Sequence, residues 1–95
     1  MAAGFHWNPR KAASNLKKHG VSFQEAITVF SSPLARIFDD EHHSIHEQRE
    51  IIIGHSARER LLLVSFTERE GIIRIISARK ATKNERKDNE EGVKG

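Results

Sequence analysis

Residues 72–87 read IIRIISARKATKNERK, and this stretch contains the change from strand to helix that decides the fold. Its first half is rich in isoleucine, which favours a buried strand. Thr82 and Glu85 then have the spacing of a capping box, which predicts that a short helix begins at once. Arg79 and Lys80 lie between the two elements. The strand therefore ends in two cations that either keep its end soluble or bind an anionic partner.

The composition fits one small domain. Of the 95 residues, 37% are hydrophobic, which allows a two-layer fold but no enclosed pocket for a large cofactor. The chain has no cysteine, which excludes disulfides and thiolate metal sites. No apolar run approaches the roughly 18 residues of a membrane helix, and the first residues lack the pattern of a signal peptide. We expect a cytoplasmic protein that uses neither a cofactor nor a membrane.

Positive charge is unevenly distributed along the chain. The formal net charge is +3 and the sequence pI is about 9.6. Basic residues dominate residues 1–20 and 49–80, whereas acidic residues dominate residues 21–48. This asymmetry favours nucleic acid as a partner, although an ordinary charged surface explains it equally well.

The N-terminal third predicts two helices joined by a very short connection. Asn8 and Pro9 form a helix start, because asparagine caps free N–H groups and proline fits the first helical position. Gly20 ends this helix in a position that suits the left-handed conformation. Ser22 and Glu25 form another capping box, and a Ser-Ser-Pro sequence stops the second helix.

The remaining pattern is that of strands. They are expected at residues 34–38, 49–55, 61–67 and 72–78, and a short strand is expected before the first helix. Short links between them predict an antiparallel meander. The fold class is therefore α+β, with two N-terminal helices packed on an antiparallel sheet of about four strands and a short C-terminal helix. Residues 1–87 are expected to form the domain, and residues 88–95 a flexible tail.

Several short motifs, in this order and spacing, make the chain resemble a known family. They are FHWNP from Phe5, KA from Lys11, NL from Asn15, KHGV from Lys18, E-x-R from Glu47, RLLLV from Arg60 and IRIISARKAT from Ile73. Over residues 5–87 they resemble the BrnT family, toxins of type II toxin–antitoxin modules. Glu59 departs from the pattern, because the family more often has glycine there.

The resemblance implies a RelE/ParE-type fold and an endoribonuclease activity that arrests growth. It also implies a ribbon-helix-helix antitoxin of the BrnA type, which neutralises the toxin and binds operator DNA together with it. Operator DNA is thus a partner only through the antitoxin complex.

Metal-free RNA cleavage needs a base for the 2′-OH proton, cations for the phosphate and an acid for the leaving oxygen. Arg79 is the first choice among the cations, because a stiff strand aims its planar guanidinium at an open surface. The alternative for Arg79 is an ion pair with an acid. The predicted catalytic residues are Lys11, Glu47, Arg58 and Arg79, with Glu47 as the base. The predicted RNA contacts are Arg60, Arg74, Lys80 and Lys83.

The positions of Arg74 and Arg79 differ by an odd number of residues. Regular alternation along a strand places them on opposite faces, so we expect that they do not share a cleft. Arg74 is then either an RNA contact or part of a salt bridge over the helices.

The loop between residues 39 and 47 contains His42, His43 and His46 with acids nearby. Two adjacent histidines cannot easily share a tetrahedral site, so no metal site is predicted. His46 is an alternative to Glu47 as the base.

Two functions from other classes fit the same sequence. A non-catalytic nucleic-acid-binding module would lose affinity gradually with each cation removed and show a steep salt dependence. A gyrase-directed toxin on the same fold would act on DNA supercoiling without cutting RNA.

Overall fold

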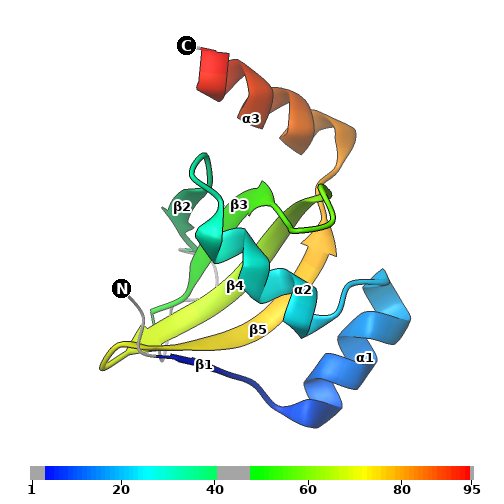
Figure 1. The fold of residues 1–95 in the computed structure, drawn as a ribbon, viewed down its shortest axis with the longest axis vertical. Coiled ribbons are helices and arrows are strands. Elements are labelled where there is room, and N and C mark those ends of the chain that lie inside the picture. The colour runs from blue at the N-terminus through cyan, green and yellow to red at the C-terminus, as the bar shows by residue number, and fades with distance from the viewer. Residues whose placement is uncertain (1–3, 41–47, 95) are drawn as a thin grey trace.

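The structure is a computed structural model that describes residues 4–40 and 48–94. The elements, drawn in Figure 1, are β1 (Gly4–His6), α1 (Pro9–His19), α2 (Phe23–Thr28), the 3-10 turn η1 (Val29–Ser31), β2 (Arg36–Asp39), β3 (Glu50–His55), β4 (Leu61–Arg69), β5 (Ile72–Lys80) and α3 (Lys83–Lys94). The predicted α+β class, with two N-terminal helices, a sheet and a C-terminal helix, is confirmed.

The sheet has five strands in the order β1-β5-β4-β3-β2. Strands β2 to β5 form the expected antiparallel meander. The difference from the expected sheet is β1, which joins it and runs parallel to β5, with Phe5 opposite Ile73 and His6 opposite Arg74. The sheet is therefore mixed, and its first and last strands in the sequence, β1 and β5, lie side by side (Figure 1).

Local capping chemistry starts and stops the N-terminal helices as expected. The side chain of Asn8 accepts hydrogen bonds from the backbone N–H groups of Arg10 and Lys11 at 2.8 and 3.3 Å. Gly20 ends α1 with a φ of 70°, a left-handed conformation that costs glycine little. The hydroxyl of Ser22 accepts a hydrogen bond from Glu25 N at 3.0 Å, and α2 begins there.

Helices α1 and α2 cover one face of the sheet, which we call the helical face (Figure 1). The core lies between these layers. The fully buried Phe23, Val21 and Val29 pack there against Leu62 and Ile75 of the central strands. Burying these side chains supplies the main driving force for folding, on the order of 1.5–3 kcal/mol for each large one.

Strand β5 contains a bulge that reverses its alternation. Ser65 pairs with Ser77 and Phe66 pairs with Ile75, so Ile76 is an extra residue without a partner on β4. The buried positions shift accordingly, because Ile75 and then Ala78 face the core.

The bulge overturns the expectation that Arg74 and Arg79 lie on opposite faces. Arg74 pairs with Thr67 and Arg79 pairs with Leu63. Thr67 and Leu63 lie four positions apart on β4 and therefore on one face. That prediction was wrong, because it assumed regular alternation. Both arginines lie on the face opposite the helical face, which we call the second face.

Helix α3 lies over part of the second face and runs to Lys94, past the predicted domain end at residue 87. Glu85 and Asn89 of α3, with Phe38, Ile53 and Leu63 of the sheet, line a small cavity of about 280 Å³ beneath it. Ile53 is buried although it points away from α1 and α2, because α3 covers it.

The turn between β3 and β4 holds a strained backbone position. Glu59 has a φ of 61°, which costs a non-glycine residue about 1–2 kcal/mol. Glycine avoids this strain, but its greater conformational freedom in the unfolded chain offsets about 0.5–1 kcal/mol of the stabilisation. We expect Glu59→Gly to raise the free energy of unfolding by about 0.5–1 kcal/mol in urea denaturation. Glu59→Gln keeps the strain and should match the parent; equal stability of all three proteins would contradict the prediction.

Candidate functional site

The predicted site residues lie in several separate places. Arg58 and Arg60 belong to the turn between β3 and β4, and Lys11 is exposed in the first turn of α1. Arg79 lies on the second face, whereas its neighbour Lys80 pairs with the core residue Leu62 and lies on the helical face. Lys83 is in the first turn of α3, and Arg74 lies farther back along β5. Glu47, His42, His43 and His46 lie outside the described residues.

Arg60 takes part in a buried network around Glu25. Its Nε donates a hydrogen bond to Glu25 Oε2 at 2.9 Å, and its Nη2 donates to Oε1. Nη2 also donates to the carbonyl of Gly20 at 3.1 Å, and Ser56 Oγ donates to Glu25 Oε2 at 2.7 Å. The network therefore joins the turn between α1 and α2 to the turn between β3 and β4.

Because this network is largely buried, its role is to stabilise the fold. The side chain of Glu25 is 5% exposed and that of Arg60 is 25% exposed. The hydrogen bond from Arg60 lowers the pKa of Glu25, with burial opposing it. Arg58 is 73% exposed and its Nη1 lies 3.9 Å from Glu25 Oε1. An RNA phosphate would have to compete with Glu25 for Arg60, so the role of Arg60 in RNA binding stays a prediction.

Arg79 forms an ion pair, the alternative to an RNA contact that its sequence position left open. Its Nη1 and Nη2 donate to the two carboxylate oxygens of Glu85, each at 2.8 Å. Glu85 also completes the capping box, accepting from Thr82 N at 2.8 Å while its own N donates to Thr82 Oγ1 at 3.2 Å. The hydrogen bonds from Arg79 lower the pKa of Glu85 to about 2.

Asn15 fixes the strand end that carries Arg79. Its Nδ2 donates to the carbonyls of Val21 and Ala78 at 2.9 and 2.8 Å, and its Oδ1 accepts from Ala78 N at 3.1 Å. This buried amide ties α1 to β5 one residue before Arg79. The arginine therefore leaves the sheet from a rigid position.

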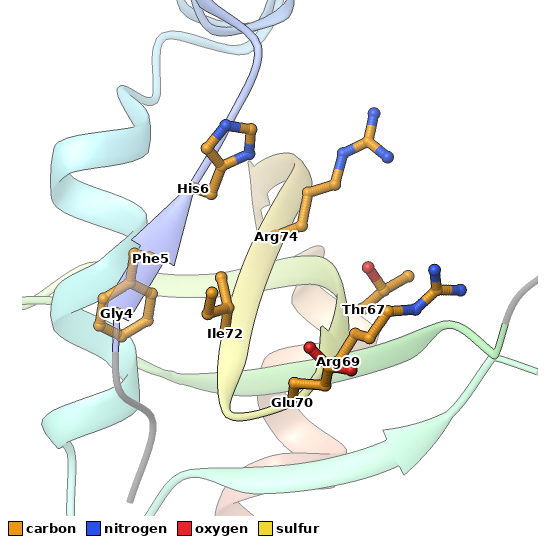
Figure 2. Close-up of a pocket in the computed structure, with 8 residues that line it drawn as sticks. All are labelled: Gly4, Phe5, His6, Thr67, Arg69, Glu70, Ile72 and Arg74. Atoms are coloured by element: carbon orange, nitrogen blue, oxygen red, sulfur yellow. The ribbon is translucent and has the colours of Figure 1, made fainter.

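Arg74 lines a cavity of about 570 Å³ at the other end of β5, where β1, β4 and β5 meet. Figure 2 shows Arg74 and Ile72 of β5, with His6 of β1 on one side and Thr67 and Arg69 of β4 on the other. The pairings His6 to Arg74 and Arg74 to Thr67 place these three side chains on the second face. We call this hollow the strand-end cavity; Gly4, Phe5 and Glu70 complete its lining.

His6 and Arg69 were not predicted as site residues from the sequence. The hairpin turn could have identified Arg69 from the sequence. Its turn residues Glu70 and Gly71 have φ values of 54° and 80°, and the turn places Arg69 opposite Ile72. His6 has no such signal, because it joins the cavity only through the parallel pairing of β1 with β5.

Among the residues that the structure describes, Glu50 is a carboxylate whose pKa is raised above its ordinary value. Burial raises the pKa of Glu50, and the nearby charges of Asp39 and Glu68 add to the effect. Glu50 pairs with the core residue Phe66 and so belongs to the helical face, away from Arg74 and Arg79. It is therefore not a proton acceptor for a substrate on the second face.

Neither a metal cluster nor a membrane helix is present in the described part of the chain. Within residues 4–40 and 48–94, no group of three or more metal-ligating side chains is placed to hold an ion. No helix in the same ranges has the length and apolar character to cross a membrane.

Comparison with known proteins identifies the family. Residues 7–85 match the family described as "Ribonuclease toxin, BrnT, of type II toxin-antitoxin system". The fold is similar to the crystal structure of the Brucella abortus ribonuclease toxin BrnT, with a TM-score of 0.66 and 23% identity over 84% of this chain and 97% of that one. No curated protein matches the sequence. Because the family match spans most of the chain, the protein belongs to the BrnT family of type II toxin–antitoxin ribonuclease toxins.

Proposed function

We propose that this chain is an endoribonuclease toxin that cleaves RNA without a metal ion, arrests growth and is neutralised by a cognate antitoxin. The observation that carries the proposal is the family match over residues 7–85. The common face of Arg74 and Arg79 supports it, because one RNA strand lying along β5 can reach both guanidinium groups.

In the proposed chemistry, the scissile phosphate lies at the Arg79 end of β5. Arg79 stabilises the charge that develops on the scissile phosphate. To do so, Arg79 exchanges its hydrogen bonds to the Glu85 carboxylate for hydrogen bonds to the phosphate. Glu47 is the proposed base for the 2′-OH proton. Arg58, in the turn before β4, and Lys83, at the start of α3, are proposed to add positive charge near the bound strand. Lys11, on α1, and Lys80, on the helical face, are proposed to add only to the overall attraction of RNA.

The proposed partner is an antitoxin of the ribbon-helix-helix, BrnA type. Type II modules pair a toxin with a protein antitoxin, and the family match supports such a partner here. The antitoxin would cover the basic second face and exclude RNA from it.

The test is cleavage of bulk RNA by the purified chain in EDTA, beside Arg79→Ala. We expect the parent to cleave and Arg79→Ala to lose about 100-fold or more in rate, as when one donor to a developing anion is removed. Exposed Arg10 on α1 gives the matched control Arg10→Ala, which should cleave like the parent.

One further variant separates the guanidinium from the docking of α3. Glu85→Gln breaks the ion pair but keeps Arg79, so it should retain cleavage. Equal cleavage by the parent and Arg79→Ala would remove Arg79 from the site. Tight RNA binding without cleavage by the parent would instead favour a non-catalytic nucleic-acid-binding module.

A further inference from the structure

The strand-end cavity has the features of a binding site. It is a hollow open to solvent with a volume of about 570 Å³, within the range of pockets that hold small organic groups. Its polar lining is mostly basic, with Arg69 and Arg74 on neighbouring strands, His6 beside Arg74, and Glu70 as the one acid. The parallel pairing of β1 with β5 builds one wall, so the cavity depends on the tertiary fold rather than on one loop.

The cations of this cavity are available to a ligand. Among the described residues, the structure records no hydrogen bond or ion pair from the side chains of Arg69 or Arg74, in contrast to Arg60 and Arg79. Two such guanidinium groups favour an anion with several acceptor oxygens, for which their planar donors are suited.

The cavity also has an apolar surface next to its cations. The side chain of Ile72 is 48% exposed and lines the hollow between Gly4 and Arg69. An apolar surface beside cations suits a nucleotide, whose base is flat and apolar on its faces and whose phosphate is charged. An acidic peptide would use the cations but would leave Ile72 uncovered.

We infer that the strand-end cavity holds one nucleotide of single-stranded RNA, with its phosphate on Arg69 and Arg74 and its base against Ile72. This inference rests on the proposed function and names a second binding position for the same substrate. Arg74 and Arg79 are roughly 15 Å apart along β5 at about 3.3 Å per residue, so the cavity binds a nucleotide farther along the strand than the neighbour of the cleaved one. Arg69 and Arg74 are positioning residues in this arrangement.

The test measures binding rather than cleavage. The probe is a fluorescent single-stranded RNA oligomer with 2′-O-methyl groups, which lacks the attacking hydroxyl and cannot be cut. We expect the double variant Arg69→Ala/Arg74→Ala to bind about tenfold more weakly than the parent. Its plot of log affinity against log salt should be shallower by about 0.7 for each phosphate that the variant no longer neutralises. Thermal unfolding checks that the double variant folds, which its exposed positions favour.

Two controls make the result specific to the cavity. Arg10→Ala/Lys17→Ala removes the same charge from exposed positions on α1 and should weaken binding less than twofold. Glu70→Asn removes the acid of the cavity and suits the left-handed φ of 54° at that position, so it should bind more tightly than the parent.

The outcomes distinguish the inference from the proposed function. Equal losses for the two double variants, or no binding of the probe by the parent, would overturn the cavity assignment. Unmodified RNA that is cleaved at the parent rate by Arg69→Ala/Arg74→Ala would also overturn it, while the nuclease proposal stands. Probe binding that depends on the cavity, with no cleavage of unmodified RNA by the parent, would leave the cavity assignment standing and overturn the nuclease proposal.

Discussion

Replacing Glu25 with alanine should lower the free energy of unfolding by about 3 kcal/mol. The substitution removes the partner of Arg60 and of Ser56 from a network in which the carboxylate is 5% exposed. Breaking a buried ion pair costs about 3–5 kcal/mol, and the lower end applies because a quarter of the Arg60 side chain reaches solvent. The turns on either side of the network would then lose their common anchor.

Urea denaturation at neutral pH measures this loss. The neighbouring exposed Gln24 provides the control, because Gln24→Ala should change the free energy of unfolding by less than about 0.5 kcal/mol. The double variant Glu25→Met/Arg60→Met removes both charges and should recover part of the stability that Glu25→Ala loses. A loss no larger than that of Gln24→Ala would show that the network does not hold the two turns together.

The pH dependence of the same variant has a definite sign. The folded-state pKa of Glu25 lies below its ordinary value of 4.5, so its contribution is present above that pH and is lost as pH falls through the folded-state value. The difference between the parent and Glu25→Ala should therefore narrow in acid.

Acidification should release helix α3 from the sheet. The pKa of Glu85 falls from 4.5 to about 2 in the folded chain, because Arg79 donates two hydrogen bonds to its carboxylate. A lowered folded-state pKa means that this stabilisation is complete above pH 4.5 and is lost as the pH falls toward 2. Both side chains are about one-third exposed or more, so solvent screens the pair, and we expect local opening of α3 rather than global unfolding.

Amide hydrogen exchange of α3, compared between the parent and Glu85→Gln, tests this release. Glutamine preserves the shape of the capping box with Thr82 but carries no charge for Arg79. At pH 7 the variant should exchange faster in α3 than the parent, and near pH 2 the two should agree after correction for intrinsic rates. The control is Glu59→Gln, which makes the same substitution at an exposed turn, and in this variant α3 should exchange at the parent rate. Equal protection of α3 in the parent and Glu85→Gln at pH 7 would show that the pair does not hold the helix.

Local chemistry explains why much of the fold could be predicted from the sequence. The caps at Asn8, Ser22 and Thr82 act within a few residues, and each begins a helix where its spacing indicates. The antiparallel meander follows in the same way from short links between apolar runs. The order of elements therefore needs no long-range information.

The candidate site could be predicted only in part, because its geometry depends on distant partners. Glu25 was identified as a cap residue, but its buried carboxylate binds Arg60, 35 positions away. His6 reaches Arg74 through a parallel pairing that no local motif indicates. For Arg79 the alternative was an ion pair with an acid, and the structure supplies that acid as Glu85.

The unpaired Ile76 makes the common face of Arg74 and Arg79 a matter of chain length rather than of residue type. A strand with one residue fewer would keep both arginines, yet it would turn one of them toward α1 and α2. Relatives can thus carry the same letters on β5 without presenting the same surface. An alignment that places a gap within this strand would equate side chains that point in opposite directions, so comparisons across the family should count residues between the two arginines before they compare identities.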